Sequence, residues 1–353
     1  MADSTPNIRL TFRNGGWVLA MAGAAVLGLI VWAILPAVLQ LSNHAPGDNA
    51  TIESYAFDLS DLRIDRSTIV PSMRHRNMSP VMNLPGILSS QEVQRLNAVQ
   101  RNPYLVSDDL VVGVTLNGES RAYPLHVLHV HEIINDILGE HPISIVWHWP
   151  SGHVAVYHRV VDGRELQFAN SGLAGNGGML IYDEQENVGG EQLFSTILGK
   201  SVSGTPLQLE PVTHDVVNWK TWDLMHPEAT VVSADERLKK RYRKADPRLY
   251  FLTDTIYFPS SPMPEEGTDP KTAVVVIPTE GGNVVYSIPQ LLEQVDDTGV
   301  VQVNIDGSMV NISVNQSPLY AMLRNANGSI VPSQRSLWFA WYGNHPADML
   351  NTP

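Results

Sequence analysis

The sequence predicts an α+β protein, mostly antiparallel β, in which two divergent β-rich halves follow one N-terminal transmembrane helix. The 353 residues include 26 Gly and 24 Pro but only 17% charged residues, a turn-rich composition typical of β-rich globular chains. Apolar runs alternate around tight-turn dipeptides, and a long apolar segment without charges precedes them. The chain has no cysteine, which excludes disulfides, thiolate metal sites and cysteine nucleophiles.

The transmembrane helix is predicted at residues 15–41, inside a stretch from Asn14 to Gly47 that lacks Asp, Glu, Lys and Arg. A bilayer core needs about 20 apolar residues, and this segment is too long for the apolar region of a cleaved signal peptide. Arg9 and Arg13 precede it and acidic residues follow it. The positive-inside rule then predicts that residues 1–14 are cytoplasmic and that the bulk of the chain is periplasmic, held at an inner membrane by a single pass.

The remaining chain is expected to divide at changes in its apolar pattern. We predict a linker and lead-in at 42–104, a first half at 105–235, a connection at 236–270 and a second half at 271–353. In the first half, "LVVGVTLNGESRAYPL" predicts a hairpin that turns at Asn117-Gly118.

The spacing of apolar residues predicts the secondary structure of the segments after this hairpin. Ile133, Ile134, Ile137 and Leu138 have helical spacing and predict a short helix that ends at Gly139. "HPISIVWHW" and "HVAVYHRVVDGRELQFA" predict strands, and "SGLAGNGGMLIYDEQ" predicts a glycine-rich loop that enters another strand.

Two pairs of segments indicate an internal repeat. "LVVGVTLNGESRAYPL" resembles "AVVVIPTEGGNVVYSIPQL" later in the chain, and "WKTWDLMHPEATVVS" resembles "LWFAWYGNHPADMLN". His226-Pro227 and His345-Pro346 occupy equivalent places, so each histidine is expected to end a helix before the proline.

These motifs also carry a family resemblance. Taken in order with "HEIINDILGEHPISIVW", they resemble the DUF3179 family, exported bacterial and archaeal proteins of unknown function, over roughly residues 105–350. Where the family usually has a two-cysteine loop this chain has "WHWPSGHVAV", with His148 and Ser151 at the two cysteine positions. The thiol chemistry that the resemblance implies cannot occur here, and the family supplies no assigned reaction.

A histidine cluster is the candidate site. Imidazole is a good ligand for copper and zinc, and no thiolate is available. His129 and His131 would share a face if their segment were extended, and His148 and His153 flank a turn that would place them on neighbouring strands. The candidate metal ligands are His129, His131, His148 and His153, with His126, Glu132 and Asp136 nearby. Copper is preferred to zinc, and the alternatives are a structural site in place of the cysteine loop and acid–base catalysis.

The functional hypothesis is a membrane-anchored periplasmic accessory protein, a non-catalytic subunit of a larger membrane complex that could be a metalloenzyme. A scaffold that keeps its packing motifs without its cysteine loop favours binding over catalysis. The expected partners are the membrane, through residues 15–41, and a membrane protein; the formal net charge of −13 argues against nucleic acid. The alternatives are a histidine-based copper-binding or copper-delivery protein and an enzyme that uses the histidine cluster.

Overall fold

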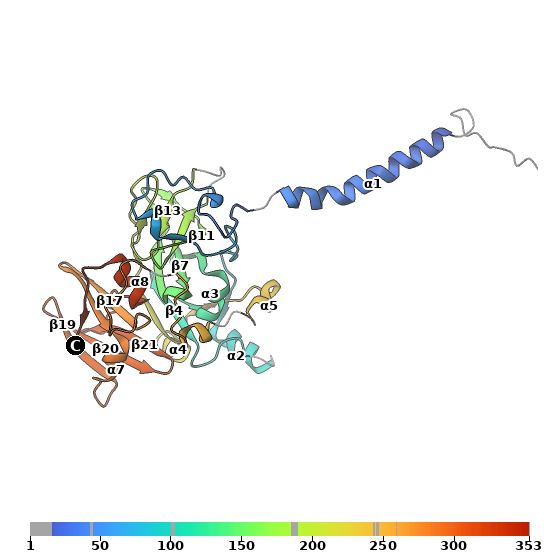
Figure 1. Ribbon diagram of the computed structural model, residues 1–353. Coiled ribbons are helices and arrows are strands. Elements are labelled where there is room, and N and C mark those ends of the chain that lie inside the picture. Colours follow the sequence, from blue (N-terminus) through green and yellow to red (C-terminus); the bar gives the residue numbers. More distant parts are fainter. Residues whose placement is uncertain are drawn as a thin grey trace, which may run out of the picture. The chain divides into compact units, whose positions relative to one another are not determined.

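The computed structural model describes residues 16–42, 45–99, 103–184, 190–242, 244, 247–258 and 260–352. The chain divides into two compact units, Met1–Ala45 and Pro46–Pro353. In the first unit α1 is a continuous helix, Gly16–Ser42 (Figure 1). Its segment Gly16–Leu35, with a mean hydropathy of 2.6, is the one helix of the described residues long and apolar enough to cross a membrane. The apolar N-terminal helix is confirmed, and its orientation stays a prediction.

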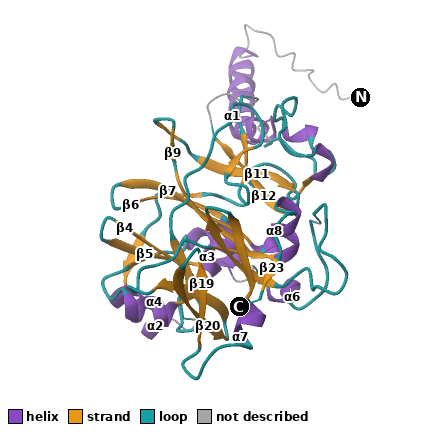
Figure 2. Cartoon of the chain, turned by 90° about the vertical axis from the view of Figure 1, so that its left-hand side faces the viewer, coloured by secondary structure: helices purple, strands orange, loops and turns teal. Residues whose placement is uncertain are grey.

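The second unit is built around an eight-stranded sheet, here called the central sheet (Figure 2). Its strand order is β2 (Met82–Asn83), β6 (Ile133–Leu138), β7 (His141–His148), β8 (His153–His158), β22 (Gln334–Leu337), β17 (Ala273–Thr279), β18 (Gly282–Ser287) and β23 (Leu350–Asn351). Neighbouring strands are antiparallel except for β2–β6 and β18–β23. The predicted α+β class with mostly antiparallel sheets is therefore confirmed.

Two five-stranded sheets, a three-stranded meander and a two-stranded sheet complete the described part of the unit. The β11 sheet has the order β1 (Ile69–Pro71), β11 (Phe168–Gly175), β12 (Gly178–Asp183), β13 (Leu193–Ser195), β14 (Lys200–Ser201). The β4 sheet has the order β15 (His214–Asn218), β4 (Leu110–Leu116), β5 (Glu119–Pro124), β16 (Thr230–Val232), β3 (Ile87–Ser89). The meander is β19 (Val300–Ile305), β20 (Ser308–Gln316), β21 (Leu319–Asn325), and β9 (Val160–Val161) pairs with β10 (Arg164–Glu165).

The helices are short and connect or cover these strands. They are α2 (Ser90–Val99), α3 (Leu125–His131), α4 (Trp219–Met225), α5 (Lys239–Tyr242), α6 (Arg248–Phe251), α7 (Ile288–Leu292) and α8 (Trp338–Asn344). Single 3-10 turns lie at Glu53–Tyr55, Arg66–Thr68, Trp149–Ser151 and Glu236–Leu238. His226 and His345 are the C-cap residues of α4 and α8, as their positions before proline predicted.

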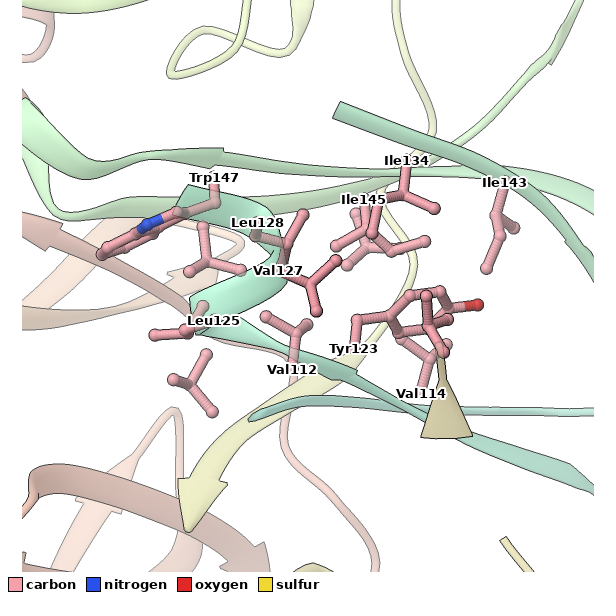
Figure 3. Packing of buried hydrophobic residues seen from close by; sticks show 14 of the residues in the cluster. Val112, Val114, Tyr123, Leu125, Val127, Leu128, Ile134, Ile143, Ile145 and Trp147 are labelled. Carbon is pink, nitrogen blue, oxygen red and sulfur yellow. The ribbon is translucent and has the colours of Figure 1, made fainter. Parts of the chain in front are cut away.

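The part of the central sheet formed by β6, β7 and β8 buries both of its faces. Ile133 on one face packs in the core shared with the β11 sheet, whereas Ile134 on the other face packs in the core shared with the β4 sheet. Figure 3 shows Ile134 and Ile145 facing Val112 and Tyr123 in this second core. Successive residues of these strands therefore face two different interiors.

This double burial explains why the helix predicted at Ile133–Leu138 is wrong. Apolar residues on both faces of a strand remove the alternation that identifies a strand, and their spacing then imitates a helix. The segment is strand β6, and the helix, α3, ends just before it at His131. Glu132 ends α3 in the left-handed region, with φ 58°, and redirects the chain into β6.

The tight turns agree better with the predictions from the sequence than this helix does. Asn117 and Gly118, with φ 48° and 83°, join β4 to β5 as predicted, because both positions of this turn need positive φ. The segment predicted as a glycine-rich loop is instead the β11–β12 hairpin, with Asn176 and Gly177 at φ 47° and 79°. Its strands are wholly buried.

The two predicted halves contain strands in the same arrangement. The order β15–β4–β5–β16 and the order β22–β17–β18–β23 both read antiparallel, antiparallel, parallel. In both, a short helix follows the hairpin (α3 or α7) and another precedes the parallel strand (α4 or α8). The described part of 42–104, predicted as a linker and lead-in, contributes β1, β2 and β3 to three different sheets and so belongs to the folded unit.

Candidate functional site

Three segments that carry the family resemblance meet at one cavity of about 240 Å³ between the central sheet and the β11 sheet. They are the junction of α3 with β6, the end of β7 with the turn after it, and β11. We call this space the motif cavity. It is lined by Ser72, Met73, Glu132, His148, Trp149, Pro150, Asn170, Met179, Tyr257 and Phe258.

Glu132 brings a buried carboxyl group to the motif cavity. Its backbone is held on both sides: its N–H donates to the Leu128 carbonyl at 2.8 Å, and its carbonyl accepts from the Trp147 N–H at 2.8 Å. Its Oε2 accepts from Asn170 Nδ2 at 2.7 Å, and Ser79 adds a second side-chain hydrogen bond. Burial raises the pKa of Glu132 to about 7, against the lowering effect of these two hydrogen bonds. The group therefore changes protonation near neutral pH.

His148 brings a neutral imidazole to the same cavity. Its Nδ1 lies 2.7 Å from Ser151 Oγ, and that hydroxyl donates to the His148 carbonyl at 3.1 Å. Both contacts are satisfied when the ring proton is on Nδ1, which leaves Nε2 with a lone pair. The ring stacks on Phe258 with centroids 6.0 Å apart. Burial, and the neighbouring His153, lower the pKa of His148 to about 3, so the ring is uncharged at neutral pH.

His153 lies opposite His148 in the β7–β8 pair, as the predicted turn required. Its ring is committed elsewhere: Nδ1 lies 3.1 Å from the Arg335 carbonyl and Nε2 lies 3.0 Å from the Thr196 carbonyl. Burial lowers the pKa of His153 to about 4, so at neutral pH one nitrogen alone carries a proton to donate. Neither nitrogen is directed at the motif cavity.

His131 is also held by protein groups on both ring nitrogens. Nδ1 lies 2.5 Å from the Pro80 carbonyl, and Nε2 lies 2.6 Å from the Tyr242 hydroxyl. Because Leu125–His131 is helical, His129 and His131 do not share a face, contrary to the extended arrangement considered from the sequence.

Of the remaining candidates, His126 and His129 lie on the opposite side of the central sheet, and Asp136 is buried in an ion pair. His126 and His129 line a second, larger cavity, where the His129 ring lies 6.0 Å from the Trp147 ring. Asp136 accepts from Arg121 Nη1 at 2.7 Å and from the Tyr123 hydroxyl at 2.8 Å, which makes it a buried structural ion pair.

The four predicted histidine ligands therefore do not converge. Within the described ranges, no group of three or more His, Asp or Glu side chains is arranged to hold a metal ion. Two of the named residues, His148 and Glu132, do share a cavity, so metal binding there stays a prediction. Asn170 and Met179, which also line the cavity, were not predicted from the sequence. They lie on β11 and β12 beside the "SGL" motif, which could have indicated them.

The fold and the site define a β-rich α+β protein with a cavity between two packed sheets that contains a few polar side chains. The chain belongs to the DUF3179 family, described as proteins of unknown function, and the family model matches residues 83–329. The matched range contains Glu132, His148 and Asn170. Neither the curated proteins nor the solved structures that were compared contain a match to the chain.

Proposed function

We propose that this protein is a membrane-tethered accessory protein that binds a ligand in the motif cavity without transforming it. The observation that carries the proposal is that one cavity contains both a carboxyl group that titrates near pH 7 and a neutral imidazole. Ser151, in the turn after β7, does not provide a nucleophile to this cavity, because its hydroxyl is buried and donates to the His148 carbonyl. This arrangement favours binding over nucleophilic catalysis.

Copper is the ligand that the donor groups fit best. The Nε2 lone pair of His148 and the Glu132 carboxylate can bind a divalent metal, and Met73 and Met179 line the same cavity. Imidazole and thioether ligands favour copper over Mg²⁺ or Ca²⁺. Because metal displaces the proton of Glu132, affinity should rise with pH up to about 7, the pKa of that group.

The test is the copper content of the full chain, purified in a mild non-ionic detergent without chelators or a histidine tag and measured by mass spectrometry. We expect about one copper per chain in the native protein, and a loss in His148→Ala and in Glu132→Gln. His129→Ala is the matched control, since His129 lines the other cavity. Copper lost equally in all three variants, or absent from the native protein, would contradict a copper site in the motif cavity.

The membrane location rests on α1 and can be tested separately. The chain has no cysteine, so Glu280→Cys places a single thiol at an exposed position. If residues after α1 are periplasmic, a membrane-impermeant maleimide labels this variant in spheroplasts. Labelling that requires lysis would reverse the proposed orientation.

The accessory role supposes a membrane partner, and the matching strand orders support the proposal that the two halves are divergent copies of one unit. We expect the detergent-extracted chain to migrate with a partner membrane protein. Replacing residues 15–41 by an unrelated anchor tests whether that association runs through α1. Migration as a free chain under all mild conditions would argue against a subunit role.

A further inference from the structure

A second cavity, of about 770 Å³, lies on the opposite face of the central sheet from the motif cavity and shares none of its lining residues. We call it the Arg335 cavity. It opens where Leu125 and Trp147 of the first half meet Ala273, Arg335 and Leu337 of the second half. Its volume lies within the range of roughly 300–1,000 Å³ that is usual for small-molecule sites.

Arg335 is a cation without an anionic partner among the residues that the structure describes. Its partly buried side chain makes one hydrogen bond among the described residues, from Nη1 to the Leu319 carbonyl at 2.7 Å, and no ion pair. The buried arginines of the described residues are all paired: Arg76 with Glu191 at 2.8 Å, Arg121 with Asp136 at 2.7 Å and Arg159 with Glu165 at 2.9 Å. A guanidinium has five N–H donors, so Arg335 retains donors for a ligand.

Trp147 lines the same cavity and carries a buried, unsatisfied donor. Its side chain is only 3% exposed, yet its Nε1–H finds no acceptor among the described residues. Buried indole N–H groups normally have a partner, because a donor left unsatisfied costs about 1–3 kcal/mol. Trp147 therefore supplies an aromatic wall to the cavity, and the unused donors that face a ligand there are those of Arg335.

Three of the other charged groups at the cavity make hydrogen bonds with the backbone. Lys271 Nζ donates to the carbonyls of Thr253 at 2.7 Å and Thr255 at 3.1 Å, and to that of Tyr250. The Asp109 carboxylate accepts from a backbone N–H at 2.8 Å, as does that of Asp269. The lining carries three acids, Asp108, Asp109 and Asp269, and three cations, Arg248, Lys271 and Arg335. Among the described residues none of these acids forms an ion pair with Arg335, so its guanidinium keeps unused donors beside apolar walls.

We propose that the Arg335 cavity binds a small organic carboxylate whose charged end accepts hydrogen bonds from Arg335 and whose apolar body lies against Trp147, Leu125 and Leu337. An arginine fork and a carboxylate match in geometry and can form two parallel hydrogen bonds. This site is independent of the copper proposal, because its residues lie on the other face of the sheet.

The test compares 3-phenylpropionate with its uncharged amide, 3-phenylpropionamide, on the full chain in a non-ionic detergent by ligand-observed NMR. We expect the carboxylate to bind about tenfold more tightly than the amide, the ratio that one charge-assisted contact of roughly 1.4 kcal/mol provides. Arg335→Met should abolish this preference and leave amide binding unchanged, whereas Arg335→Lys should keep part of it. Arg95→Met, at an exposed position of α2, is the control for loss of an unrelated charge.

The melting temperature of the ligand-free variant distinguishes a ligand-binding role of Arg335 from a purely structural one. Loss of a structural arginine should lower the melting temperature of the ligand-free protein. Arg335→Met removes a partly buried cation that has no ion pair among the described residues, so the melting temperature should not fall. Arg335→Gln keeps N–H donors without the charge and should also lose the preference for the carboxylate, which provides a test if Arg335→Met fails to fold. Equal affinity of the native chain for carboxylate and amide, or native carboxylate affinity in Arg335→Met, would overturn the proposal.

Discussion

Replacing Glu132 by Gln should stabilise the protein at alkaline pH and leave it unchanged at acid pH. Burial raises the pKa of Glu132 from its ordinary value of 4.5 to about 7. The folded protein therefore holds this proton more tightly than the unfolded chain does. The stability that this group contributes is complete below pH 4.5, falls as pH rises from 4.5 to 7, and is lost above that.

The size of the effect follows from the shift. One pKa unit corresponds to roughly 1.4 kcal/mol, so a shift of this size removes about 3 kcal/mol from the free energy of unfolding above pH 7. Gln is nearly isosteric, and its amide oxygen can still accept from Asn170 Nδ2. We expect Glu132→Gln to exceed the native protein by about 2–3 kcal/mol at pH 8 and to match it at pH 4.

Urea unfolding of metal-free protein, followed by tryptophan fluorescence at several values of pH, measures this difference. The matched control is Glu191→Gln, another buried glutamate, which is paired with Arg76 at 2.8 Å. Its loss leaves a buried cation unpaired and should cost about 3–5 kcal/mol at pH 8. The two variants should thus differ in sign. A stability change for Glu132→Gln that is the same at pH 4 and pH 8 would refute the reasoning.

Three further changes test other parts of the structure. His148, whose pKa burial lowers to about 3, stays neutral in the folded protein while the unfolded chain takes up a proton below about 6.5, so stability falls with acidification from 6.5 towards 3. In urea titrations, the free energy of unfolding should fall between pH 8 and pH 5 by about 2 kcal/mol less in His148→Gln than in the native protein. Asp136→Asn leaves Arg121 buried without its partner at 2.7 Å and should cost about 3–5 kcal/mol by denaturant unfolding; a change below about 1 kcal/mol would disprove a structural ion pair. Gly113→Ala places a Cβ 2.2 Å from Trp222 Cε3 and should cost about 3 kcal/mol or more by thermal unfolding, whereas an unchanged melting point would contradict this packing.

The local features that were predictable are those set by neighbouring residues. Asn117-Gly118 fixes its own turn, because few other dipeptides accept positive φ at both positions. The apolar stretch at 15–41 identifies a helix by length and composition alone. The helix-ending roles of His226 and His345 follow from the prolines after them.

The candidate site depended on contacts between distant segments and was only partly predictable. Glu132 and His148 could be named from their motifs, but their meeting with Asn170 depends on the packing of the central sheet against the β11 sheet. His131 and His153 looked equivalent to His148 in the sequence. They differ because backbone carbonyls lie within reach of their rings, and such contacts have no signal in the sequence.

The junction of the two halves within the central sheet has a consequence for how the chain is made. Strand β8 pairs with β22 through Val154 and Arg335, and the His153 ring contacts a carbonyl 182 positions further along the chain. During synthesis from the N-terminus, the edge of β8 that pairs with β22 therefore stays unpaired until nearly the whole polypeptide has been made. An open edge can recruit strands of other chains, and contacts so distant in sequence form slowly. We expect newly made chains to need protection of this edge, and truncation before residue 334 to yield aggregates rather than a smaller folded protein.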